Sequence, residues 1–362
     1  MPSRRLPWAK NTELVGITLK LQSQQDSSLY SQYPIGLHAW WLDQVRQQNP
    51  ELSAPLHDEQ SEKPFTLSDL KGTEPEQPLR LKAEQFYTWT ITALSQPVAE
   101  WLRQWLLHLP PVLELRGAPM NIIDWTIAYS PTTYKKLLQP TATDSPTVPL
   151  SFLSPTSFRH KGHHLPLPLP TNVFHSYLRR WNIFSNKPYD QEDFLAWVDE
   201  CVIISRHHLQ SMKVVAGKKG AVTGFTGAIE FGLTQEGLAY PEYVQLFSAL
   251  GQLAPYCGTG HKTTFGLGQT ELGWTEAATG VSIPTAQNLL AQRITELTER
   301  FIAQRKRIGG DRAIQIAETL ATILARRERG ESLQVIAEDL GLSYETARTY
   351  SKRALRQVRD EK

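Results

Sequence analysis

The sequence predicts an α+β fold in which two ferredoxin-like domains stand in tandem and an all-α helix-turn-helix segment follows them. Three observations support this prediction. A succession of strand-type and helix-type patterns occurs twice along the chain, prolines crowd residues 146–170 between the two occurrences, and only helical periods follow afterwards. A chain of 362 residues has room for two or three domains, and we place them at residues 1–140, 141–280 and 285–362.

The first half begins with a strand and a helix. Residues 13–21 alternate between apolar and polar side chains, which is the period of a half-buried strand. Residues 36–46 repeat apolar side chains three and four positions apart, which predicts a helix. Asn49 and Pro50 end that helix because the residue before a proline resists helical geometry. Residues 85–91 then predict a further strand of the same domain.

The second half repeats the order of the first. Residues 149–152 begin a strand, residues 172–181 predict a helix, and residues 200–208 and 221–231 predict strands. Residues 241–253 predict a second helix, opened by a proline in its first turn. Each half therefore resembles a βαββαβ unit, in which helices lie on one antiparallel sheet.

Three helical periods in succession predict the C-terminal segment. Gly341 supplies the permissive backbone for a tight turn, and Ser343 can cap the next helix, so the pattern is that of a helix-turn-helix. The third helix would carry a cationic face of Arg348, Lys352, Arg356 and Arg359, which is either a solvated surface or a nucleic-acid contact. The apolar stripes are Ile316, Leu320, Ile323 and Leu324, then Leu333, Ile336, Ala337 and Leu340, then Ala347, Tyr350, Ala354 and Val358.

Composition indicates a cytoplasmic protein. Hydrophobic residues make up 40% of the chain, yet no apolar run reaches the ~18 residues of a membrane span, and no export signal is visible. Only Cys201 and Cys257 are present, which excludes a disulfide framework and a cysteine-rich zinc site. Residues 301–362 hold 13 Lys or Arg against 9 Asp or Glu, so an anionic partner is expected.

A glycine-rich segment, GTGHKTTFGLGQ at residues 258–269, follows a predicted helix and precedes a strand. It matches neither a P-loop nor a dinucleotide fingerprint. Such a loop can bring bare backbone amides and one lysine against a phosphodiester, although a flexible glycine-rich turn is the alternative. The candidate residues are Gly258, Gly260, His261, Lys262, Gly266 and Gly268.

This loop and three further segments, in this order, resemble the CRISPR-associated endoribonucleases that process precursor CRISPR RNA, the sixth Cas protein family of the RAMP superfamily. The other segments are NPELSAPLH at residues 49–57 with KPFTLSDL at 63–70, FLSPTSF at 152–158, and VFHSYLRRWN at 173–182. The resemblance covers residues 12–275 and implies tandem ferredoxin-like (RRM-like) domains. It says nothing about the tail.

The resemblance implies cleavage without a metal or a cofactor: a 2′-hydroxyl attacks the adjacent phosphate and leaves a cyclic phosphate and a 5′-hydroxyl. His57 matches the family's catalytic histidine and Lys63 its stabilising lysine, as proton transfer and charge stabilisation require. Leu42 stands where some members have a tyrosine, and His38, at the start of the same helix, is the candidate substitute.

The implied partner is CRISPR repeat RNA, both precursor and processed, and the resemblance allows a CRISPR effector complex as a further partner. Arg179 and Arg180 on the first helix of the second half, and Lys218 and Lys219 in a predicted hairpin, are candidates for phosphate contacts beside the glycine-rich loop. The histidine-rich residues 159–164 lack cysteines and carboxylates, so we reject a zinc site there. Two alternatives remain: a non-catalytic RNA-binding RAMP subunit, and a DNA-binding regulator that works through the helix-turn-helix.

Overall fold

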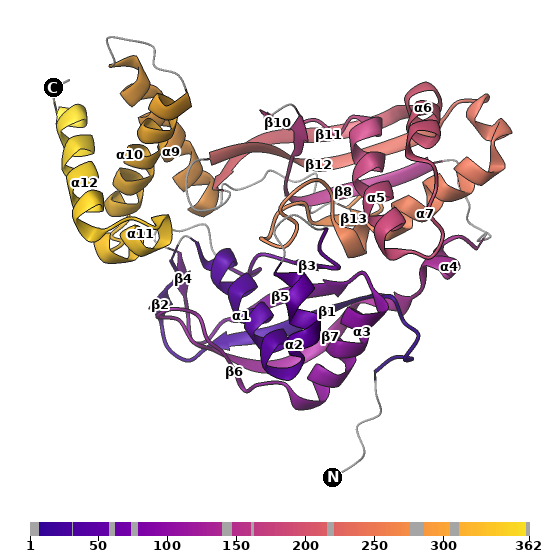
Figure 1. Ribbon diagram of the computed structural model, residues 1–362, viewed down its shortest axis with the longest axis horizontal. Coiled ribbons are helices and arrows are strands. Elements are labelled where there is room, and N and C mark those ends of the chain that lie inside the picture. The colour runs from indigo at the N-terminus through magenta and orange to yellow at the C-terminus, as the bar shows by residue number, and fades with distance from the viewer. Residues whose placement is uncertain are drawn as a thin grey trace.

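The computed structural model consists of two α/β domains with a helical bundle at one side (Figure 1). It describes residues 7–30, 32–57, 62–73, 79–139, 147–160, 163–215, 221–275, 286–304 and 311–359. No helix in these ranges is both long and apolar enough to cross a membrane.

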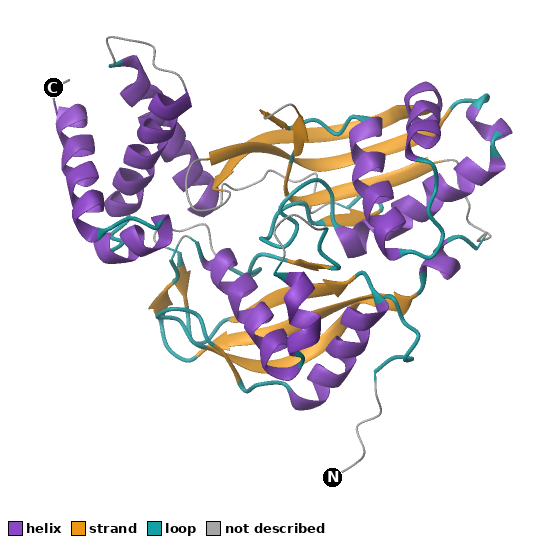
Figure 2. Ribbon diagram, in the orientation of Figure 1, coloured by secondary structure: helices purple, strands orange, loops and turns teal. Residues whose placement is uncertain are grey.

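The N-terminal domain is an antiparallel sheet with helices against one face (Figure 2). Its strands lie in the order β3 (Phe65–Leu67), β5 (Phe86–Ala93), β1 (Leu14–Ser23), β7 (Met120–Thr132) and β6 (Val112–Leu113). Its helices are α1 (Tyr33–Gln48), α2 (Pro50–Leu56) and α3 (Gln96–Trp105), with the turn η1 (Leu106–His108) and the short pair β2 (Ser27–Ser28) and β4 (Arg80–Leu81) beside them. The alternation in β1 buries one side of the strand because that side faces the helices, where Trp41, Trp89 and Trp105 fill the core.

The C-terminal domain repeats this arrangement. Its sheet has the order β11 (Val202–Val215), β12 (Ala221–Leu233), β8 (Thr147–Thr156) and β13 (Thr270–Leu272). Helices α5 (Pro170–Phe184), α6 (Gln191–Cys201) and α7 (Pro241–Cys257) cover one face (Figure 1). The smaller elements are α4 (Tyr134–Leu137), β9 (Phe158–His160), β10 (His163–Leu165) and η2 (Gly237–Ala239). The predicted fold class of two ferredoxin-like units is confirmed, since each half runs strand, helix, two strands, helix, strand.

One local prediction is confirmed and extended, and another needs correction. Asn49 and Pro50 end α1 as expected, but they also start α2: the Asn49 side chain accepts a hydrogen bond from the amide of Leu52, and Pro50 occupies the first helical turn. Residues 200 and 201, predicted as strand, are the end of α6, and the strand begins at residue 202.

The C-terminal segment contains the three predicted helices, α10 (Asp311–Glu328), α11 (Leu333–Leu340) and α12 (Tyr344–Arg359), and one that was not predicted, α9 (Ala286–Ala303). The expected helix-turn-helix is present, with Gly341 in the left-handed conformation at φ +67° between α11 and α12. Helix α9 joins the bundle to the C-terminal domain, where the Asn288 amide donates a 2.9 Å hydrogen bond to the carbonyl of Lys213 in β11.

Candidate active site

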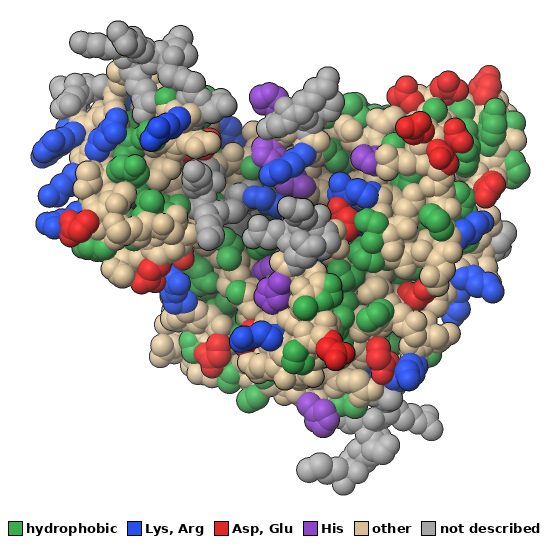
Figure 3. Space-filling model, viewed as in Figure 1, with side chains coloured by type: hydrophobic (Ala, Val, Ile, Leu, Met, Phe, Trp, Pro, Cys, Tyr) green, Lys and Arg blue, Asp and Glu red, His purple; other side chains and the backbone are tan. Residues whose placement is uncertain are grey.

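A cleft of about 860 Å³ lies where the two domains meet. One face of α1, the end of α2 and the segment before β3 contribute one wall, and the glycine-rich loop and β9 contribute the other. Figure 3 shows histidine, lysine and arginine side chains gathered along this middle part of the molecule. The lining residues are His38, Ala39, Leu42, Asp43, Arg46, Leu56, His57, Lys63, Arg159, Lys262, Thr264 and Phe265. The three catalytic candidates and Lys262 of the loop therefore line one cleft.

His38 lies in the second turn of α1 and is held by aromatic rings from both domains. Its ring stacks on Phe265 at 4.4 Å and on Phe65 at 6.0 Å between centroids. Burial, together with the nearby positive charges of Lys63 and His57, lowers the pKa of His38 to about 4. The imidazole is therefore neutral at neutral pH and can accept a proton.

His57 and Lys63 flank the polar segment between α2 and β3. His57 is the exposed C-terminal cap of α2, and its backbone amide donates to the carbonyl of Ala54 at 3.3 Å. Lys63 is half-buried, two residues before the start of β3. Leu42, which stands at the tyrosine position of some family members, lies in the same cleft but is only 5% exposed and offers no group for proton transfer.

The glycine-rich loop is folded tightly rather than open. All four of its glycines have positive φ, and a Cβ at Gly268 would lie 2.0 Å from the carbonyl oxygen of Thr259. Their amides already donate within the protein: Gly258 to Ala254 O, Gly260 to Ser176 Oγ, Gly266 to Leu67 O and Gly268 to Pro155 O. These four glycine amides are therefore not available to a phosphate, and close packing requires glycine at their positions.

The loop docks on the first domain and so places its side chains in the cleft. The Leu67 amide of β3 donates to Thr263 O at 3.1 Å, and Gly266 returns a bond of the same length to Leu67 O. Lys262, at φ +59°, is the one non-glycine residue in the described ranges with positive φ, which marks a strained position held by its surroundings. Burial and the charge of Arg159 lower the pKa of Lys262.

His261 faces the interior and does not line the cleft. Its Nδ1 donates to the carbonyl of Ser157 at 2.9 Å, its ring stacks on His164 at 4.9 Å, and its Nε2 is buried. Burial lowers the pKa of His261 to about 4, so the ring is neutral. The predicted RNA contact by His261 is therefore not supported by its position, since packing within the loop conceals both ring nitrogens.

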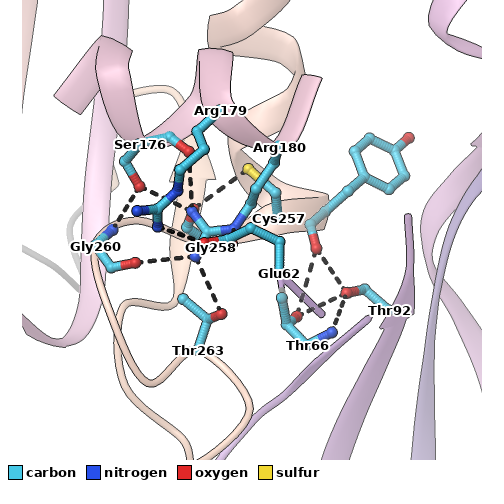
Figure 4. A network of polar contacts seen from close by, with 11 residues as sticks. Glu62, Thr66, Thr92, Ser176, Arg179, Arg180, Cys257, Gly258, Gly260 and Thr263 are labelled. Atoms are coloured by element: carbon cyan, nitrogen blue, oxygen red, sulfur yellow. Dashed lines mark hydrogen bonds and ion pairs between the residues drawn. The ribbon is translucent and has the colours of Figure 1, made fainter. Parts of the chain in front are cut away.

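Arg180 was predicted to contact RNA, but the structure buries it beneath the loop with 4% of its surface exposed. Its guanidinium donates to Gly260 O at 2.9 Å and Ser176 Oγ at 2.8 Å, and its Nε lies 3.4 Å from the Glu62 carboxylate (Figure 4). Arg179, 45% exposed, lies 2.7 Å from the same carboxylate. Arg180 therefore connects the loop to the residue beside Lys63, across the two domains.

Three further residues line the cleft that were not among the predicted site residues: Arg46, Arg159 and Phe265. Arg159 appeared only within a histidine-rich stretch, and nothing local distinguishes Phe265 from a core residue. Lys218 and Lys219 lie outside the described residues. Within the described ranges, no group of three or more His, Cys, Asp or Glu side chains is close enough to hold a metal ion.

Comparisons with known proteins agree with this architecture. Residues 150–270 match the family model described as CRISPR-associated endoribonuclease Cas6, and residues 16–109 match that of the CRISPR Cas6 N-terminal domain. Among solved structures, the product complex of Thermus thermophilus Cas6 is similar at 25% identity and a TM-score of 0.59, over 72% of this chain and 100% of that one. A Cas6 substrate mimic complex is similar at 25% identity and a TM-score of 0.55, over 72% of this chain and 99% of that one. A search of curated proteins found no match. The chain belongs to the Cas6 family of CRISPR-associated endoribonucleases.

Proposed function

We propose that this chain cleaves CRISPR repeat RNA without a metal ion, by attack of a 2′-hydroxyl on the adjacent phosphodiester. The observation that carries the proposal is the convergence of a neutral imidazole, that of His38, with the ammonium groups of Lys63 and Lys262 in one cleft. These groups supply the two needs of the reaction, which are a proton acceptor and a positive charge beside the phosphate.

The residues divide the chemistry between them as follows. Neutral His38 accepts the proton of the 2′-hydroxyl, whose oxygen then bonds to phosphorus. Lys63 and Lys262 stabilise the added negative charge on the five-coordinate phosphorus. The bond to the 5′-oxygen breaks, and His57, exposed at the end of α2, donates the proton that makes this oxygen a hydroxyl. The products are a 2′,3′-cyclic phosphate and a free 5′-hydroxyl.

We favour His38 over His57 as the proton acceptor, although the family resemblance favoured His57. The rings of Phe65 and Phe265 fix the His38 imidazole, whereas His57 lies exposed at a helix end. A fixed base holds the geometry of attack more closely than a mobile one does.

The cations around the cleft suggest the course of the RNA backbone. Arg46 and Arg159 lie on the cleft wall and are exposed, and Arg179 is half-exposed next to the loop. Such side chains position a nucleic acid through its phosphates without reading its sequence. RNA contacts by Lys218 and Lys219 stay a prediction.

The test is incubation of the purified protein with end-labelled repeat RNA in EDTA, followed by a denaturing gel. His38→Ala should lower the single-turnover rate by about 10²–10⁴-fold, as loss of a general base does. His57→Ala should also slow cleavage, and His108→Ala, an exposed histidine behind α3, is the matched control that should cleave normally.

Three results would contradict the proposal. Cleavage that stops in EDTA would exclude the metal-independent route. A product with a 5′-phosphate would exclude attack by the 2′-hydroxyl. Repeat RNA that is bound but never cut would make the chain a structural RNA-binding subunit.

A further inference from the structure

Helices α9–α12 form a module that lies beyond the matched segment of the Cas6 family, which ends at residue 270. The module has a hydrophobic core of its own, separate from the cores of the two domains. This core is formed by Leu290, Ile294, Leu297 and Phe301 of α9, Ala317, Leu320, Ala321, Leu324 and Ala325 of α10, and Ala354 of α12. The cleft therefore does not account for this separately packed module.

The turn between α11 and α12 has the geometry of a helix-turn-helix. Only residues 341–343 separate the two helices. The Leu342 amide donates to Ala337 O at 2.9 Å, which closes α11, and Ser343 Oγ accepts from the Thr346 amide at 3.2 Å, which caps α12. In a motif of this kind the two helices cross at a large angle, and the second helix stays accessible.

A buried ion cluster fixes the helix-turn-helix to the remainder of the molecule. The Arg326 guanidinium of α10 is 1% exposed and lies 2.6 Å from Glu331 and 2.7 Å from Asp339 of α11. The Asp339 carboxylate also forms an ion pair, at 3.4 Å, with the guanidinium of Arg116 in the N-terminal domain. Helix α11 therefore faces the N-terminal domain, and α12 lies on the outer side of the bundle (Figure 1).

The outer helix is strongly cationic. Helix α12 carries five Lys or Arg side chains against one carboxylate, that of Glu345. Only Ala347 and Ala354 of the helix are buried, and Figure 3 shows Lys and Arg side chains over this edge of the molecule. The cations are Arg348, Lys352, Arg353, Arg356 and Arg359, all exposed. This face is complementary to a polyanion.

We propose that α12 is a recognition helix that binds double-stranded DNA in the major groove. Its exposed N-terminal residues Tyr344, Arg348 and Thr349 would face base edges, and Lys352 and Arg356 farther along would contact phosphates. The B-form major groove is about 12 Å wide and admits an α-helix, whereas the major groove of double-stranded RNA is deep and narrow. DNA is therefore the duplex that this helix fits.

The test measures binding by the full chain to DNA and RNA duplexes of three helical turns, about 30 base pairs. Fluorescence anisotropy at low salt should detect binding of the DNA duplex by the wild-type protein. The triple variant Arg348→Ala, Lys352→Ala, Arg356→Ala should bind this duplex about 10- to 100-fold more weakly. Cleavage of repeat RNA by this variant should be unchanged. The matched control replaces three cations far from the bundle: Lys135→Ala, Lys136→Ala, Lys187→Ala.

The outcomes separate this proposal from the proposed ribonuclease function. If the protein binds duplex RNA as tightly as DNA, and the α12 triple variant loses this RNA binding, α12 belongs to the RNA site and the DNA proposal is wrong. It is equally wrong if DNA is not bound at low salt, or if both triple variants lose binding alike. Retained RNA cleavage shows that the cleft of the variant is intact, and an unchanged helical signal in far-UV circular dichroism shows that the separately packed bundle is still folded.

Discussion

Arg180 offers the sharpest test of how the cleft is assembled. Arg180→Met keeps most of the side-chain volume but removes the donors to Gly260 O and Ser176 Oγ and the ion pair with Glu62. Breaking a buried ion pair costs about 3–5 kcal/mol. Because Glu62 is 20% exposed and keeps Arg179 as a partner, we expect a loss in the free energy of unfolding near the lower end, about 3 kcal/mol.

The catalytic effect should exceed the effect on RNA binding. Release of Gly260 and Glu62 lets Lys262 and Lys63 move, and a misplacement of about 1 Å can cost about 10²-fold in rate. The single-turnover cleavage rate of Arg180→Met at saturating protein should therefore fall by about 10²-fold. Urea unfolding of the same variant, followed by far-UV circular dichroism, checks the expected loss of stability.

Salt dependence distinguishes a positioning residue from an RNA contact. Each phosphate contact on single-stranded RNA contributes about 0.7 to the slope of log affinity against log salt. Arg180→Met should leave that slope unchanged, and Arg179→Ala, the half-exposed neighbour, should lower it by about this amount. A lowered slope with an unchanged cleavage rate in Arg180→Met would refute the positioning role and restore the RNA contact.

Three further predictions concern pH, backbone geometry and the bundle. Because the pKa of folded His38 is about 4 and that of an unfolded histidine about 6.5, the unfolded chain binds more protons between these values. His38 alone should therefore account for a loss of about 3 kcal/mol in stability from pH 6.5 to 4. Urea titrations measure it as the difference between wild type and His38→Phe, since His261 adds its own loss to both. The acid limb of kcat/KM should likewise lie near pH 4, whereas that of kcat should lie higher, since bound phosphate favours the imidazolium. Gly268 and Gly341 have nearly the same φ, +68° and +67°, but only at Gly268 would an added Cβ meet backbone, 2.0 Å from Thr259 O. Thermal unfolding should show a loss in stability of about 1–2 kcal/mol for Gly341→Ala, from the left-handed backbone alone, and a clearly larger loss for Gly268→Ala. Arg326→Met removes the buried guanidinium that pairs with Glu331 and Asp339. Because these carboxylates are 12% and 14% exposed and Asp339 keeps Arg116, the bundle should lose about 3 kcal/mol, at the lower end for a buried ion pair, seen as early protease cleavage after residue 275. Equal protease resistance would contradict this.

Periodic patterns predicted the helices and strands that bury one face, because the spacing of their apolar residues can be recognised within a short stretch of sequence. Strand β1, helices α5 and α7 and the last three helices are of this kind. Helix α9 was missed although Leu290, Ile294, Leu297 and Phe301 repeat three and four apart, which is the same signal.

Burial of charged residues could not be predicted in this way. Arg179 and Arg180 are neighbours in one helix, and the sequence gives no reason to treat them differently. The direction of each side chain decides the outcome, since Arg180 lies under the loop and Arg179 lies at its edge. His261 and Lys262 divide similarly: a positive φ at Lys262 turns its side chain toward the cleft, while His261 packs inside.

Both domains contribute side chains to the cleft, and interdomain hydrogen bonds hold the two walls together. His38, His57 and Lys63 come from the first domain, and Arg159 and Lys262 from the second. The carbonyl of Tyr256, at the end of α7, accepts 2.6 Å and 3.4 Å hydrogen bonds from Thr92 and Thr66 on the first sheet, which fixes the loop start against β3 and β5 (Figure 4). Each bond holds the loop that carries Lys262 at a set distance from the strand that follows Lys63. These interdomain hydrogen bonds hold the loop in place before RNA arrives, so the proposed proton acceptor and stabilising charges would need little binding energy for their assembly.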